Sequence, residues 1–342
     1  MSGQRWLLYA LGGGMGHLTR AVALGRAARR RGHSVEVVTN SSFAPALALE
    51  AELGEGHVHR LGAELDKHAV RESIERLLDR VRPEVLVVDT FPRGLGGELA
   101  PLLPEMKARK VLVHRDLHPD YVERFGLARF VDMFDRLLVP GEPAPFAHHP
   151  RAVSTPPWLI LDAAELLDAP TARRRLGVPD EETAVSVVAV LACGRPEEVD
   201  ECTRLAETLQ RGLGPRVFVR LLASDVPPRL WPALAVMRGI DVLVGAGGYN
   251  TVQEARATGT PLVALARPRL YDRQGLRLRT SERIATLDEA LERVRALLQS
   301  ESGRHHERLA PTYVNGTWEA VRRIEDTRPP LPSGEGRGEG IG

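Results

Sequence analysis

The sequence predicts an α/β protein built from two doubly wound domains, and three observations support this prediction. The chain has 342 residues, which exceeds what one hydrophobic core usually organises and suits two domains of ordinary size. Short β-rich apolar runs alternate with helix-like stretches in both halves, as in parallel sheets that helices cover on both faces. A proline-rich stretch over 140–182 separates the halves, which is typical of a connection between domains.

The first half begins with a βαβ unit. RWLLYAL predicts a strand over 5–11, the stretch that closes on Gly32 predicts a helix over 18–32, and SVEVVTN predicts a strand over 34–40. The same alternation then predicts a helix near 69–81, a strand over 84–89, a helix near 95–108 and a strand over 110–116.

The second half repeats this alternation. We expect strands over 183–192, 216–223, 240–248 and 260–266, and helices near 196–212, 250–258, 287–299 and 316–326. The final residues lack core-forming side chains and predict a disordered tail. The predicted units are therefore a first domain over 1–150, a second over 151–328 and a tail over 329–342.

Charge and composition exclude several classes of function. Lys and Arg number 46 against 45 Asp and Glu, a formal net charge of +1, so no long-range field attracts nucleic acid. Cys193 and Cys202 have neither zinc nor redox spacing, and we expect buried free thiols and no metal site. No signal peptide and no apolar run long enough to span a bilayer stands out. We therefore expect a cytoplasmic protein.

The glycine cluster that follows the first strand, GGGMGH, lacks the residues of two common nucleotide-binding loops. A phosphate-binding NTPase loop needs a Lys that is missing here, and a dinucleotide fingerprint would need Gly where His17 stands. The second strand also ends on Asn40 instead of a ribose-binding acid. A histidine at the carboxyl edge of a parallel strand is a candidate general base, with a packing or capping role as the alternative.

The second glycine cluster, GAGGYNTVQEA, predicts a nucleotide site. Gly245, Gly247 and Gly248 would admit a diphosphate to the start of a helix, where Thr251 and backbone N–H groups could bind it. Glu254, one turn further along, could accept both hydroxyls of a ribose. An ordinary capped helix after a glycine turn is the alternative.

These two regions, GGGMGHLTRAVALGRAARRRGHSVEVVTN and VLVGAGGYNTVQEA followed by GTPLVALARPRLYDRQGLR, resemble the two signature regions of GT-B glycosyltransferases. The most similar group includes the lipid II synthase, the galactolipid synthases and the glucuronosyltransferases. The resemblance implies two Rossmann-like domains that face each other across a cleft, with a nucleotide-sugar held mainly by the second domain.

The resemblance also implies roles for individual residues. Glu254 matches the ribose-binding acid; Gly247, Gly248, Asn250 and Thr251 match the diphosphate turn, with Tyr249 at the cleft; Asp272 and Gln274 match the pair that contacts the donor sugar; and Gly13, Gly14, Gly16 and His17 would face the diphosphate and the acceptor.

We expect an inverting, metal-independent transfer of sugar, most simply from a UDP-sugar, to an acceptor hydroxyl, and no cofactor. Retaining members of the fold usually have two glutamates eight apart, but the positions eight from Glu254 are Ala246 and Leu262. His17 is the expected base, Asp89 either orients it or is itself the base, and Asp116 is the next candidate. Arg195, Arg267 and Arg273 are candidate cations for the departing diphosphate.

Two other functions stay open at this point. Non-hydrolysing sugar-nucleotide epimerases share the architecture, and a catalytically silent nucleotide-sugar-binding protein would retain the cleft. ACGRPEE, residues 192–198, favours the silent form, because relatives have a Gly/Ser-rich turn there and Glu197 and Glu198 would repel anions.

The acceptor is unknown, and a lipid-linked one would bring the protein to the inner face of the membrane. Tyr121, Phe125, Phe130 and Phe134 recur near helical spacing over 120–138, which predicts either a helix at a membrane interface or one packed on its own sheet.

Overall fold

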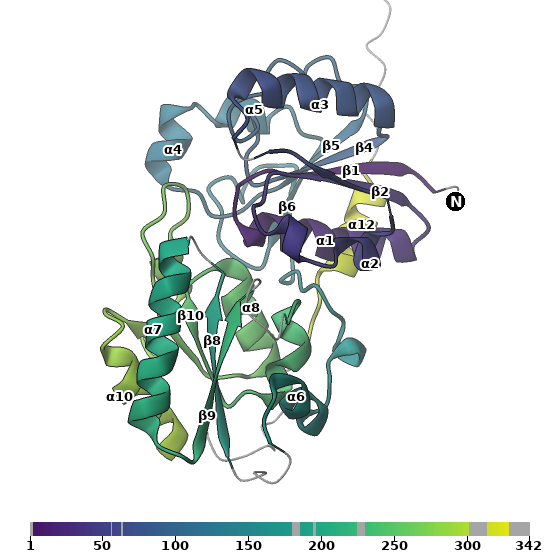
Figure 1. Cartoon of the computed structure of the whole chain (residues 1–342). Helices are drawn as coiled ribbons and strands as arrows, with labels where there is room; N and C mark the ends of the chain where they lie inside the picture. The colour runs from purple at the N-terminus through teal and green to yellow at the C-terminus, as the bar shows by residue number, and fades with distance from the viewer. Residues whose placement is uncertain are drawn as a thin grey trace, which may run out of the picture.

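The computed structural model describes residues 3–55, 57–62, 64–179, 185–193, 196–223, 230–300 and 313–327. These residues form two parallel sheets with helices packed on them, one sheet in each half of the chain (Figure 1). The predicted α/β class with two Rossmann-like domains is confirmed. The predicted tail over 329–342 lies outside the described residues.

Within the described part, the first sheet has seven strands in the order β3-β2-β1-β4-β5-β6-β7. Its strands are β1 (Arg5–Ala10), β2 (Ser34–Thr39), β3 (Val58–Arg60), β4 (Val85–Asp89), β5 (Arg109–Val113), β6 (Arg136–Pro140) and β7 (Ala152–Thr155). Its helices are α1 (Met15–Arg30), α2 (Leu49–Leu53), α3 (Lys67–Val81), α4 (Pro119–Arg124) and α5 (Ala128–Val131). β4 is buried along its whole length, because helices cover both faces of a parallel sheet and favour unbroken apolar runs.

The second sheet has five strands in the order β12-β11-β10-β8-β9. They are β8 (Ser186–Ala192), β9 (Val217–Ala223), β10 (Val242–Ala246), β11 (Leu262–Leu265) and β12 (Arg283–Ile284). The helices of this half are α6 (Ala169–Leu176), α7 (Pro196–Leu213), α8 (Tyr249–Thr258), α9 (Gln274–Arg277) and α10 (Glu289–Gln299), followed by α12 (Thr317–Glu325).

Two predicted helices of the first half are wrong. Residues 92–105 form turns and bends instead of a helix, because Gly94 and Gly97 adopt positive φ angles of 83° and 98° and prolines follow them. The stretch 120–138 is divided into α4, α5 and β6, with Gly126 at φ 54° between the two helices. Phe130 and Phe134 are buried in the core, so the stretch is not the single continuous helix that its spacing predicted.

The chain passes between the two halves at 156–162 and again at 313–316. The first sheet extends past residue 150 to β7, and the last helix, α12, returns to pack on α1 beside the first sheet (Figure 1). Glu325 of α12 accepts hydrogen bonds from Arg31 and pairs with His33, each at 2.8 Å. These two passages mean that neither half is a continuous stretch of sequence.

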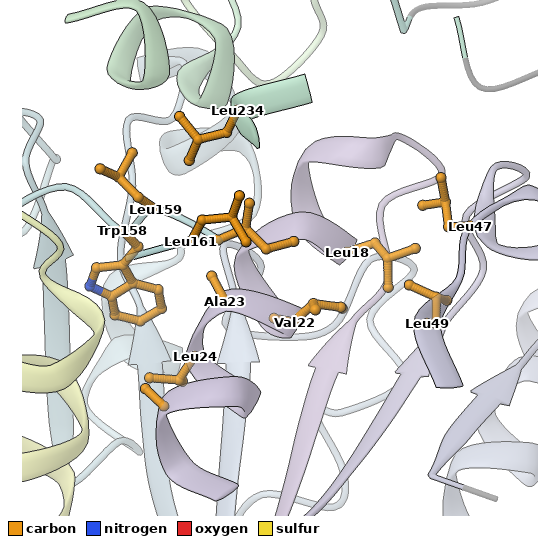
Figure 2. Close-up of a cluster of buried hydrophobic side chains, with 14 of the residues drawn as sticks. Leu18, Val22, Ala23, Leu24, Leu47, Leu49, Trp158, Leu159, Leu161 and Leu234 are labelled. Carbon is orange, nitrogen blue, oxygen red and sulfur yellow. The ribbon is translucent and has the colours of Figure 1, made fainter. Parts of the chain in front are cut away.

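An apolar cluster joins the two halves (Figure 2). Leu18 and Val22 on α1 pack with Trp158 and Leu161 of the first passage and with Leu234 of the second half, and all five are buried. Burial of apolar surface is the main favourable contribution to such packing. The N-terminus of α1 is therefore held against the second half, where α8 begins.

Candidate active site

A cavity of about 920 Å³ lies between the two halves. Its walls are the loop between β1 and α1, the ends of β4 and β5, and, from the second half, the ends of β8 and β10, the start of α8 and the loop after β11. The carboxyl ends of parallel strands are where open α/β sheets bind ligands. Most of the predicted site residues line this cavity; of those that the structure describes, Asp89, which lies behind His17, Gly247 and Arg273 do not.

The first glycine loop presents an uncapped helix N-terminus. α1 begins after Gly14, and no side chain caps its first turn. Asn40 fixes the loop from below, because its Oδ1 accepts hydrogen bonds from the N–H groups of Gly12 and Gly13 at 2.9 and 3.0 Å. In the sequence, Asn40 was informative only because it occupies the position where a dinucleotide site would have a ribose-binding acid. Its position next to the loop follows from the parallel pairing of β1 with β2.

His17 is held in one orientation by Asp89. Its Nδ1 donates to Oδ2 of Asp89 over 2.5 Å, and its Nε2 makes no hydrogen bond with any residue that the structure describes. Gly12 leaves room for the ring, since a Cβ at that position would overlap Cδ2 and Nε2 of the imidazole. Burial lowers the pKa of His17, although the hydrogen bond to Asp89 and the charge of Asp89 act to raise it. The neutral ring can thus accept a proton at Nε2.

Asp89 is a buried anion. Although burial raises its pKa, the charge of Arg20 and the hydrogen bonds from Arg20 and His17 outweigh that effect and hold the pKa well below its usual range. Arg20 donates from Nε to Oδ1 at 3.0 Å and from Nη2 to Oδ2 at 2.6 Å. Both carboxylate oxygens are therefore engaged, and the geometry favours an orienting role for Asp89 over that of a base.

The second glycine loop leads into α8, which also begins without a side-chain cap, after Gly248. A Cβ added at Gly248 would meet nothing nearer than Oγ1 of Thr251 at 4.0 Å, so this position opens into the cavity. Gly247 has a different role, because its carbonyl accepts from Arg277 at 2.8 Å and a Cβ there would meet Leu278 at 3.0 Å. The first residues of α8 therefore line the cavity.

Glu254 lies one turn into α8 and is an unpaired carboxyl group. It is 7% exposed, and its side chain makes no hydrogen bond or ion pair with a residue of the described ranges. Burial raises its pKa to about 8. A buried carboxyl without donors is costly to ionise, so hydroxyl donors from a ligand would satisfy it.

Two other predicted ligand residues have partners within the protein. Both oxygens of Asp272 pair with Arg277, at 2.7 and 3.4 Å, and Oε1 of Gln274 accepts from the backbone N–H of Arg267 at 3.0 Å. Burial would raise the pKa of Asp272, but Arg115 and Arg277 lower it overall. Both side chains still line the cavity.

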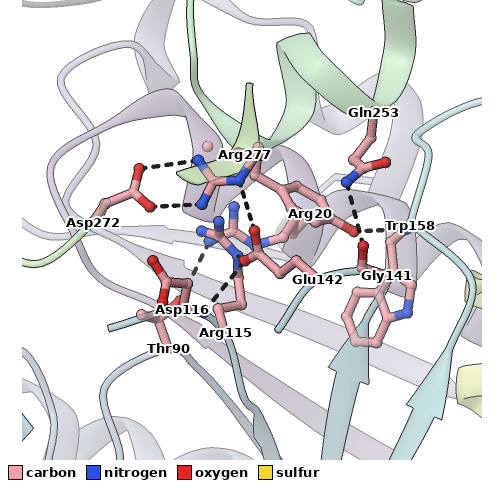
Figure 3. Close-up of polar contacts among 12 residues, drawn as sticks. Arg20, Thr90, Arg115, Asp116, Gly141, Glu142, Trp158, Gln253, Asp272 and Arg277 are labelled. Carbon is pink, nitrogen blue, oxygen red and sulfur yellow. Dashed lines mark hydrogen bonds and ion pairs between the residues drawn. The ribbon is translucent and has the colours of Figure 1, made fainter. Parts of the chain in front are cut away.

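Ion pairs join the two halves beside the cavity (Figure 3). Glu142, which follows β6, accepts from Arg115 of the first half and from Arg277 of the second, each over 2.7 Å. Asp116 of the first half pairs with Arg273 of the second. Asp116 is thus part of the contact between the halves, which argues against its role as a base.

The candidate cations for a diphosphate are paired or outside the described residues. Arg267 pairs with Glu201 over 2.5 Å, Arg273 pairs with Asp116, and Arg195 is not described. Glu198, expected to repel anions, has both carboxylate oxygens bound by Arg269, at 2.5 and 2.8 Å. Its negative charge is therefore offset next to the cavity.

Tyr249 is buried between the halves. Its side chain is 3% exposed, and the guanidinium carbons of Arg20 and Arg115 lie 5.5 and 4.6 Å from its ring centre. Its hydroxyl accepts from the backbone N–H of Trp158 at 2.9 Å. Next to it, Nδ2 of Asn250 donates to the carbonyl of Gly16 over 3.5 Å. The first turn of α8 is thereby fixed to the first half.

The described residues include neither a metal-binding cluster nor a helix that could span a membrane. No group of three or more His, Cys, Asp or Glu there is arranged to hold a metal ion. No helix among the described ranges is long and apolar enough to cross a bilayer. Cys193 and Cys202 are free thiols.

Comparison with known proteins gives matches in structure alone. No protein-family model matches the sequence, and no curated protein matches it significantly. Several solved structures match over nearly the whole chain. Among them are the glycotransferase of kitacinnamycin (TM-score 0.63, 18% identity, 96% of this chain and 100% of that one) and a protein from Listeria monocytogenes assigned as a UDP-N-acetylglucosamine 2-epimerase (0.61, 11%, 95% and 95%). MurG of Acinetobacter baumannii is another (0.51, 14%, 94% and 99%). The chain therefore has the GT-B fold, as the resemblance of its two glycine regions to that superfamily implied.

Proposed function

We propose that the protein is an inverting, metal-independent glycosyltransferase that moves a sugar from a nucleoside diphosphate sugar, UDP-linked in the simplest case, to an acceptor hydroxyl. The observation that supports this most is the pairing of two sites across one cavity. An oriented, neutral imidazole, His17, lies on one side, and an unpaired carboxyl group, Glu254, lies one turn into an uncapped helix on the other.

In this proposal the second half binds the donor. The ribose hydroxyls donate to Glu254, and the diphosphate lies at the start of α8 near Gly248, Asn250 and Thr251, where backbone N–H groups and the helix dipole favour negative charge. The sugar then lies near Asp272 and Gln274. The N-terminus of α1, at Gly13, Gly14 and Gly16, faces the same diphosphate from the first half.

The chemistry is a single displacement. Nε2 of His17 accepts the proton of the acceptor hydroxyl while the hydroxyl oxygen forms a bond to the anomeric carbon of the donor sugar. At the same time, the bond between that carbon and the diphosphate oxygen breaks. The bond electrons leave with the diphosphate, whose charge the two helix N-termini stabilise. Asp89 keeps the proton of His17 on Nδ1 and stabilises the imidazolium that forms.

A binding screen followed by a transfer assay tests this proposal. Thermal shift and calorimetry with UDP, GDP and dTDP would identify the nucleotide, and transfer from the matching nucleotide-sugars to a panel of hydroxyl acceptors would follow. Binding of a nucleoside diphosphate in the low micromolar to millimolar range is expected. No binding of any of the three would overturn the donor site.

An epimerase is the second candidate, because the Listeria protein of similar structure is assigned to that activity. Incubation with UDP-N-acetylglucosamine and no acceptor separates the two functions. Isomerised sugar nucleotide would indicate an epimerase, whereas transfer only after an acceptor is added supports the proposal. A protein that binds nucleotide-sugars without turning any of them over would be the silent form.

The acceptor and the location of the protein are proposals of the same kind. A lipid-linked acceptor would place the protein at the inner face of the membrane as a peripheral protein, and a small free acceptor would leave it in the cytoplasm. Sedimentation with vesicles that contain the active acceptor, compared with vesicles that lack it, separates the two.

A further inference from the structure

Arg20 is an almost completely buried cation next to the proposed base. Its side chain is 2% exposed, and its two hydrogen bonds to the oxygens of Asp89 form a planar fork that a Lys could not reproduce. Arg20 lies three residues after His17 on α1, so the two side chains share one face of the helix. One carboxylate, Asp89, thus binds both the imidazole and the guanidinium.

The guanidinium of Arg20 also contacts the other half of the molecule. Its central carbon lies 5.5 Å from the ring centre of Tyr249, within the range of a cation–π contact. Tyr249 is the first residue of α8, the helix that contains Glu254. Arg20 therefore contacts the His17–Asp89 pair on one side and α8, the proposed donor helix, on the other.

We propose that Arg20 is a positioning residue that couples the His17–Asp89 pair to the donor helix α8 through the ring of Tyr249. This inference rests on the proposed role of His17 as the base. It goes beyond that role in two respects. Arg20, for which the sequence suggested no function, becomes a positioning residue. Tyr249, which the sequence suggested as a ligand contact, couples Arg20 to α8.

The charges around His17 make the coupling measurable. Asp89 at the end of β4 faces it directly, Arg20 faces it from α1 and Arg115 from the residues after β5, and Glu142 after β6 faces the two arginines. Burial lowers the pKa of His17, Asp89 raises it, and Arg20 and Arg115 lower it. Loosening Arg20 should therefore raise the pKa of His17 and leave Asp89 less well neutralised.

An NMR titration of the histidine side chains tests the coupling without any substrate. The chain has 11 histidines, and the His17→Gln variant identifies the His17 signal. We expect Arg20→Gln to raise the pKa of His17 by about one unit or more. Tyr249→Leu, which does not touch the imidazole, should also raise it, by a measurable amount that stays below about one unit.

Three controls separate coupling from a general loss of structure. Tyr249→Phe keeps the ring and loses only the hydroxyl that accepts from Trp158, so the pKa of His17 should stay as in the parent. Arg20→Lys keeps the charge but not the planar fork, so it should recover only part of the parent value; it serves also where Arg20→Gln does not fold. In the Arg20→Gln,Tyr249→Leu double variant, the Tyr249 change should add nothing.

The inference would be overturned if the pKa of His17 were unchanged in Tyr249→Leu. It would also be overturned if Tyr249→Leu shifted this pKa equally in the parent and in Arg20→Gln. A failed transfer assay with the expected titration shifts would instead contradict the proposed function and leave the coupling intact. Where a donor has been found, the acidic limb of the kcat profile of Arg20→Gln should move to higher pH in parallel.

Discussion

The two glycine loops have nearly the same backbone design and different surroundings. Each joins a buried strand to a helix that begins after a glycine without a side-chain cap, at Gly14 and at Gly248. Beyond the first loop, His17 and Arg20 share a carboxylate, whereas beyond the second, Glu254 has no partner among the described residues. In the proposed function, two loops of similar backbone therefore differ in role because of the side chains within the next turn.

The largest expected effect separates the two sites by chemistry. His17→Gln removes the proton acceptor and keeps a similar size, so kcat should fall by about 10²–10⁴-fold. The affinity for UDP, measured by calorimetry, should stay within about twofold of the parent, because a retained binding site gives nearly the same binding free energy. A large loss of UDP affinity would show that His17 binds the donor instead.

A matched pair of glycine variants tests the loops directly. Gly12→Ala forces the imidazole of His17 off its position, because the new Cβ would overlap the ring, and kcat should fall by about 10²-fold. Gly248→Ala has room in the empty protein, so its melting temperature should match the parent while UDP binds more weakly. Equal effects of the two variants on kcat and on UDP affinity would contradict the division of roles.

The third prediction concerns Glu254. Glu254→Gln replaces a carboxyl group that would bind the ribose in its ionised form with a neutral amide. It should weaken UDP binding by about 10- to 100-fold, since hydrogen bonds to charged groups contribute about 1.5–3 kcal/mol. Glu75→Gln, a change at a partly exposed residue of α3 that pairs with Arg71, is the control and should bind UDP like the parent. Unchanged UDP affinity in Glu254→Gln would exclude it as the ribose ligand.

The smallest effect is a pH dependence at the second loop alone. The pKa of Glu254 is raised from 4.5 to about 8, and ribose hydroxyls would favour its ionised form, so UDP affinity should rise by about fivefold from pH 7 to pH 8. Calorimetry in buffers of different ionisation enthalpy should detect proton release on binding. Glu254→Gln should abolish both, and their persistence would assign the proton to another group.

The raised pKa of Glu254 also makes the stability of the folded protein depend on pH. Between pH 4.5 and about 8 the folded protein binds more protons at Glu254 than the unfolded chain does. The contribution of this group to stability is therefore fully present below pH 4.5 and is lost as the pH rises towards 8. The melting temperature of Glu254→Gln should fall less over this interval than that of the parent.

Much of the fold could be predicted from local sequence. Strands such as β1, β4 and β10 and helices such as α3 and α10 lie close to their predicted ranges, because apolar periodicity records which residues face a core. The same pattern misled the prediction near 95–108. Leu99 and Leu103 are spaced and buried like residues of a helix, but the segment is not helical. Local glycine geometry overrides the pattern there.

The sequence by itself determined the two glycine loops, their order along the chain and the residue types that make them candidates for catalysis and donor binding. Only the tertiary structure decided which partners these residues have. Asp89 lies 72 residues from His17 along the chain, and Tyr249 reaches Arg20 from the other half. Such pairs leave no periodic trace in a sequence, because parallel pairing of distant strands and closure of two domains bring the side chains together.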